Sequence, residues 1–129
     1  MFKNIRKKTG SKTQNTFNWE GKNNELVALI NDRKIEEALS LGQSLVEYVD
    51  RTFRRDAAQK ATSYNNMGMA FMMAEDYELA DRCFREALEM RKRLYGKDHN
   101  EVAVILLNMV QLYRIQAEAI FRANRVETE

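Results

Sequence analysis

The chain repeats itself with a period of 42 residues, and this feature constrains its fold more than any other. A shift of 42 positions places Asn24 on Asn66 and then on Asn108, and it places Ala38 on Ala80. A regular repeat of tens of residues is typical of a solenoid, in which one supersecondary unit stacks on the next. Because solenoids usually present a surface to other chains, the sequence indicates a scaffold rather than a catalyst.

The composition favours helices. The 129 residues include no proline and five glycines, which suits long uninterrupted helices better than a sheet with frequent turns. The length allows one domain with its own core. Helical spacing of apolar residues predicts five helices, at about 23–31, 35–53, 57–74, 77–95 and 100–125. We therefore expect an all-α fold, a short α-solenoid of two helical hairpins followed by a long C-terminal closing helix.

The N-terminal segment differs in character from the rest. Residues 1–20 lack periodicity and predict a basic flexible tail, while the helical domain is expected over 21–129. Residues 1–22 carry six Lys or Arg and one Glu, a net +5, which leaves −3 for the remaining chain. The tail could attach to nucleic acid or to an anionic membrane through phosphate charge. Because the cluster is short and the body opposes it, a solubilising tail is the favoured interpretation.

No residue pattern predicts catalysis, a cofactor or a metal. His99 is the only histidine and Cys83 the only cysteine, so neither has the convergent partners that a metal site needs. His99 is expected to be a loop or capping residue. The single cysteine excludes an internal disulfide and suits a reducing compartment. The apolar runs Met67–Ala74 and Val102–Leu107 are too short to span a bilayer, so a cytoplasmic protein is expected.

The third and fourth predicted helices resemble a tetratricopeptide repeat. The matching positions are Tyr64, Met67, Gly68, Phe71, Tyr77, Ala80, Phe84 and Ala87. Gly68 and Ala80 are small where the two helices of a hairpin would cross closely. The 42-residue period and the loop over 95–100 are similar to the repeats of kinesin light chains, with Asn100 in place of a usual proline.

The resemblance covers roughly residues 20–125, with units at about 21–60 and 61–100 and a half unit at 101–125. It implies a non-catalytic adaptor whose concave groove binds a peptide or helix of another protein. The implied peptide-binding residues are Asn24, Asn65, Asn66, Met69, Met73, Asn108, Gln111 and Arg114. The asparagines would pair with a peptide backbone, or instead with neighbouring helices or water. The two methionines would add an adaptable apolar patch, and Arg114 would meet an acidic side chain.

Self-association is the alternative function. The last predicted helix is apolar nearly all the way round, and such a helix is expected to be covered on a second side. We expect a symmetric homodimer through residues 102–121, with a partner protein or a folded-back Phe17–Trp19 as other possible covers. The self-association residues are predicted to be Leu106, Met109, Leu112, Tyr113 and Ile120.

Overall fold

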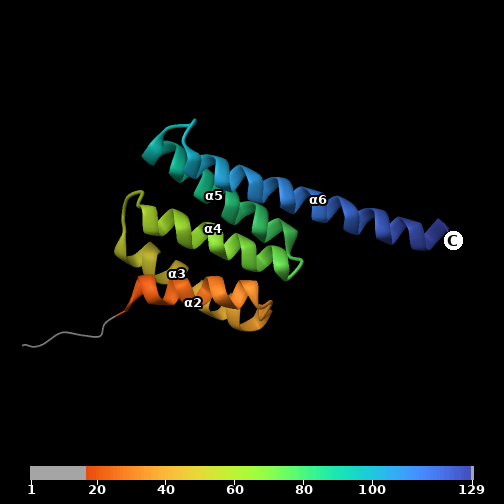
Figure 1. Ribbon diagram of the computed structural model, residues 1–129, viewed down its shortest axis with the longest axis horizontal. Helices are drawn as coiled ribbons and strands as arrows, with labels where there is room; N and C mark the ends of the chain where they lie inside the picture. The colour runs from red at the N-terminus through yellow and green to blue at the C-terminus, as the bar shows by residue number, and fades with distance from the viewer. Residues whose placement is uncertain (1–16, 129) are drawn as a thin grey trace, which may run out of the picture.

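A computed structural model describes residues 17–128 of the chain, with side chains through residue 125, and all five elements in this range are α-helices. They are α2 (Trp19–Asn31), α3 (Ile35–Thr52), α4 (Ala58–Met73), α5 (Tyr77–Tyr95) and α6 (Asn100–Thr128). The hairpins α2–α3 and α4–α5 stack side by side, and α6 packs on the second hairpin and extends beyond it (Figure 1). The prediction of an all-α solenoid with two hairpins and a long closing helix is confirmed.

Local side chains fix where the helices begin and end. Asp76 caps α5 by accepting from the amide of Leu79, and Gly96, with φ of 92°, ends it. Residues 17–20 of the predicted tail belong to the folded domain instead, because Phe17 packs on Tyr48, the side chain of Asn18 caps α2 and the helix begins at Trp19. The rest of that predicted tail, residues 1–16, lies outside the described residues.

The two hairpin turns share one backbone geometry although their residues differ. Arg33 follows α2 with φ of 58°, and Glu75 follows α4 with φ of 64°. These positions are 42 residues apart, and each donates its amide to a carbonyl three residues earlier. The repeat is therefore present in the conformation of the turns, where the sequence itself does not show it.

Close crossing of the helices explains the small residues. A Cβ added at Gly68 of α4 would lie 2.7 Å from the ring of Phe84, which is fully buried in α5. In the first hairpin, a Cβ added at Gly42 would lie 2.5 Å from the sulfur of Met67. The predicted role of Gly68 is confirmed, and Gly42 takes a similar role in α3, where α4 approaches.

The aromatic residues before and in α2 pack on the first hairpin and on α4. The ring of Phe17 stacks on Tyr48 of α3 with centroids 4.2 Å apart. The indole N–H of Trp19 donates to the hydroxyl of Ser63, a fully buried residue of α4, at 2.8 Å. The suggestion that Phe17–Trp19 covers the last helix is therefore wrong, since both residues are engaged elsewhere.

One face of α6 belongs to the core. Val102, Ile105, Met109 and Leu112 are buried in a cluster that also contains Phe84 of α5. Met109 and Leu112 were predicted to face a second copy, and the structure corrects this, because their side chains are already covered within the chain. Leu106, Tyr113 and Ile120 are exposed and remain available to another molecule.

The length of α6 also bears on the membrane question. By length and composition alone, Asn100–Arg125 would be able to cross a membrane, although only 17% of its most apolar window is buried within the protein. The expectation from uninterrupted apolar runs missed this property. Core helices of soluble proteins can have the same length and composition. In this structure α6 packs on α5 as part of the solenoid.

Candidate functional site: the concave groove

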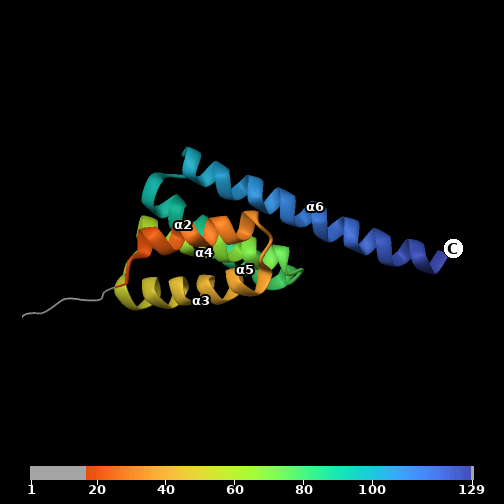
Figure 2. The same ribbon diagram turned by 60° about the horizontal axis from the view of Figure 1, so that its bottom comes forward.

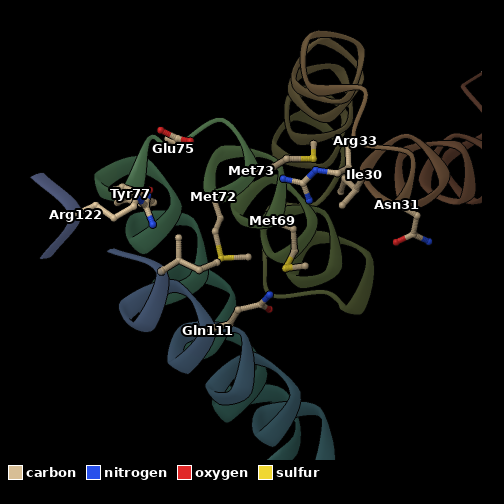
Figure 3. Close-up of a pocket in the computed structure, with 11 residues that line it drawn as sticks. Ile30, Asn31, Arg33, Met69, Met72, Met73, Glu75, Tyr77, Gln111 and Arg122 are labelled. Carbon is tan, nitrogen blue, oxygen red and sulfur yellow. The ribbon is translucent and has the colours of Figure 1, made fainter. Parts of the chain in front are cut away.

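The first helices of the three units, α2, α4 and α6, border a groove near the turns of the two hairpins. It encloses about 320 Å³. Its lining residues are Ile30, Asn31, Arg33, Met69, Met72, Met73, Glu75, Tyr77, Gln111, Ile115 and Arg122. Figure 3 shows Met69, Met72 and Met73 extending from α4, with Ile30 and Arg33 from the end of α2 to one side and Gln111 from α6 below. The groove thus joins side chains from all three units.

The bed of the groove is apolar and adaptable. Met72 is buried, while Met69 and Met73 are half-buried and reach the groove surface. Ile30 and Ile115 contribute branched carbons from the two neighbouring units. Methionine side chains are flexible and polarisable, so they adjust to apolar groups of different shape. Three of the predicted peptide-binding residues, Met69, Met73 and Gln111, belong to this lining. Their role in binding a peptide stays a prediction.

The charges of the groove come from residues that sequence reasoning did not select. Arg33 and Arg122 lie at its two sides, and neither forms an ion pair within residues 17–125. Glu75 adds one negative charge at the turn after α4. Arg114, the predicted cation, is not part of the lining and instead pairs with Glu118 at 3.1 Å. The periodicity of α6 would have found Arg122, because it follows Ile115 by seven residues on the same face.

The predicted asparagine ladder links neighbouring helices. The Asn66 side-chain amide donates to the Asn23 side-chain oxygen at 2.7 Å, and Asn108 donates to Asn65 at 2.9 Å. The second bond is the first one moved by 42 residues, so the same contact joins α2 to α4 and α4 to α6. Asn65 is only 8% exposed. None of these four residues lines the groove, which favours the interpretation that they hold the units together.

We expect Asn108→Ala to lower the free energy of unfolding by about 1–2 kcal/mol, because it leaves the buried amide of Asn65 without its partner. Urea denaturation followed by circular dichroism measures the change. Asn24→Ala is the matched control: Asn24 occupies the same repeat position but is exposed, and its side chain forms no hydrogen bond with another residue of 17–125. Equal effects of the two substitutions would show that the bond between the units contributes nothing.

Cys83 and His99 have structural surroundings. Burial raises the pKa of the half-buried Cys83 thiol to about 11, so this thiol is almost wholly protonated at neutral pH. The Nδ1 atom of His99 accepts from the amide of Glu101 at 3.0 Å, and its ring stacks on Tyr95. The predicted capping role of His99 is confirmed. No group of three possible metal ligands occurs in the part of the chain that the structure describes.

Comparison with known proteins agrees with this architecture. The family model for the tetratricopeptide repeat matches residues 27–93 and again, in an overlapping position, residues 59–126. Together the matches cover most of the chain, which therefore belongs to the tetratricopeptide repeat family. No curated protein matches the chain. The finer similarity to the repeats of kinesin light chains stays a prediction.

Proposed function

We propose that this protein is a non-catalytic interaction module whose concave groove binds a short segment of another protein. Tetratricopeptide repeats generally mediate contacts between proteins. The observation that supports the groove as the binding site is its composition: an apolar bed of methionine and isoleucine beside two arginines that form no ion pair within residues 17–125. The free thiol of Cys83 suits a reducing compartment and supports a cytoplasmic location.

The chemistry of the groove selects a class of segment. An apolar side chain of the ligand would rest on Met69 and Met73, and an acidic side chain beside it would reach Arg33 or Arg122. Glu75 would repel a second acidic group placed towards the turn after α4. The segment proposed here therefore carries one apolar residue next to a single acidic residue.

Selection from a phage-displayed library of random peptides tests this proposal. We expect the enriched peptides to carry Leu, Met or Phe adjacent to Asp or Glu. Arg122→Glu should weaken their binding by about tenfold or more, because it replaces attraction by repulsion at a partly shielded site. Fluorescence anisotropy with labelled, enriched peptides measures the dissociation constant for each variant.

Arg114→Glu is the matched control, since it makes the same charge change on the same helix outside the groove lining. It should leave the affinity nearly unchanged. Met73→Gln tests the apolar bed and should weaken binding without a change of charge. An enriched peptide whose affinity responds equally to Arg122→Glu and Arg114→Glu would place the binding site elsewhere.

Self-association through α6 is a second candidate function, favoured by a separate observation. This helix carries seven of the large apolar residues that remain exposed in the described chain. They are Val104, Leu106, Leu107, Val110, Tyr113, Ile120 and Phe121. All of them except Val104, which lies on the groove side with Gln111, form one exposed strip, and an apolar strip of this length is typical of an interface. The two functions use different surfaces and are compatible with each other.

A further inference from the structure

The outward face of α6 carries a narrow apolar stripe with the spacing of a coiled coil. Its residues, called here the α6 seam, follow one another at alternating steps of three and four positions. They are Ala103, Leu106, Val110, Tyr113, Ala117 and Ile120, and all six are exposed. A stripe with this spacing is suited to pairing with one other helix. It lies beside the buried face of α6 rather than within it.

The repeat shows what kind of element belongs on this seam. Moved back by 42 residues, Val110 falls on Gly68 of α4, and that residue contacts Phe84 of α5. The seam is thus the counterpart of the face of α4 that receives the second helix of its hairpin. No second helix of the third unit occurs within the described residues, because α6 continues as one helix to Thr128. An antiparallel helix fits the seam.

We propose that the α6 helix of a second copy of this chain occupies the seam. The two helices run antiparallel and are related by a two-fold axis that lies between them, at the level of Gln111 and Leu112 along the helix. This deepens the self-association proposed above and rests on it. In this register Ala103 faces Ile120 of the second copy, and Leu106 faces its Ala117. Val110 faces Tyr113 at the centre.

The sizes of the side chains select this orientation. Antiparallel pairing sets a small residue against a large one at both outer layers, so the volume is even along the interface. Parallel pairing in register would oppose Ala103 to Ala103 and Tyr113 to Tyr113, which leaves gaps at some layers and crowding at another. A two-fold axis also matches the commonest symmetry of soluble assemblies.

The residues that flank the seam agree with the same register. Leu107 and Phe121, which are 69% and 70% exposed, would face each other across the pair on both sides of the axis. Among these flanking residues, Arg114 lies closest to the axis, where it would approach Arg114 of the second copy. Its charge is compensated by Glu118 at 3.1 Å, so the axis does not bring together two unpaired charges.

The shape of the molecule leaves room for this arrangement. The C-terminal half of α6 projects beyond the hairpins in both views (Figures 1 and 2). In the antiparallel pair, each projecting half returns over the first half of the other α6. Within the seam, Tyr113 forms hydrogen bonds with Asp81 and Arg85 of α5, and a hollow of about 610 Å³ adjoins it.

Sedimentation velocity of the full chain over a range of concentrations tests the assembly. We expect the chain to form a dimer. Val110→Glu should raise its dissociation constant by about a hundredfold or more, because the symmetric interface would bury two copies of the new charge near the centre of the seam. Val104→Glu is the matched control, since Val104 is also exposed on α6 but shares the face of Gln111 on the groove side. It should leave the dimer intact.

Disulfide trapping in a Cys83→Ala background tests the register. The double variant Ala103→Cys with Ile120→Cys should form a linked dimer on mild oxidation, while each single variant should not. In the antiparallel register, two copies of residue 103 are separated by about 25 Å along the helix, and a disulfide requires Cα atoms within about 7 Å. Parallel pairing would link the single variants instead.

The outcomes separate the possible failures. A monomer at every concentration would overturn self-association and leave α6 to a helix of another protein. A dimer that resists Val110→Glu, or links through single cysteines, would overturn the seam and its register but not self-association. Peptide binding in the groove depends on neither result, because Met73 and Arg122 lie on another face.

Discussion

Phe84→Ala should lower the free energy of unfolding by about 3–5 kcal/mol. Phe84 is fully buried at the centre of the cluster that joins α4, α5 and α6, and its ring fills the space left by Gly68. Truncation removes the transfer free energy of the ring and leaves a cavity that the crossing helices cannot close. Urea denaturation at protein concentrations low enough to avoid association measures the change.

Phe121→Ala is the matched control for this prediction. It removes the same ring from a site that is 70% exposed on α6. Under the same dilute conditions it should change the free energy of unfolding by less than about 0.5 kcal/mol. Comparable losses for the two variants would show that Phe84 is not the centre of the core that this packing indicates.

Arg91→Ala should lower the free energy of unfolding by about 2–3 kcal/mol. Its side chain is only 8% exposed, and its guanidinium donates to the backbone oxygen of Glu101 at 2.9 Å and to the hydroxyl of Thr62 at 3.3 Å. These bonds attach the first turn of α6 to α4 and α5. Their loss leaves a carbonyl oxygen without its donor and removes a packed side chain. The carboxylate of Glu101 also pairs with Arg91, at 3.3 Å, but it is 46% exposed and can turn to water in the variant, which limits the effect.

Arg93→Ala provides the comparison on the same helix. Arg93 also forms an ion pair, with Asp56 at 2.6 Å, but its side chain is 57% exposed. The hydrogen bond with Arg93 lowers the pKa of Asp56, but solvent screens the interaction between these exposed charges. We expect little change in stability for this variant in denaturation experiments. An effect as large as that of Arg91→Ala would contradict the dependence on burial.

Much of the fold follows from local sequence. Asp76 and Gly96 set the ends of α5 through capping and a left-handed backbone, which depend on neighbouring residues alone. The small size of Gly68 opposite a large aromatic residue predicted the close crossing of α4 and α5. The family could be inferred from the same repeated positions, because the two helices of each hairpin pack against each other in the same way.

The site was only partly predictable. Met69, Met73 and Gln111 reach the groove as expected, since their repeat positions place them on the inner face of α4 and α6. Arg33 was missed because it lies in a turn, where helical spacing gives no direction to a side chain. The asparagines were ambiguous, since an amide that suits a peptide backbone suits another amide equally well. Only the tertiary structure decided between these partners, because it shows side-chain hydrogen bonds of 2.7–2.9 Å between asparagines of neighbouring helices.

The sequence by itself determined that this protein is a helical repeat with two hairpins and an uninterrupted last helix. The tertiary structure alone decided which side of that last helix is core. Apolar residues surround α6, so its periodicity permits several rotations about its own axis. Contact with α5 selects one of them, burying Met109 and Leu112 and leaving Val110 exposed. The reason is that the rotation of a helix is set by long-range packing, which local spacing does not encode when every face is apolar.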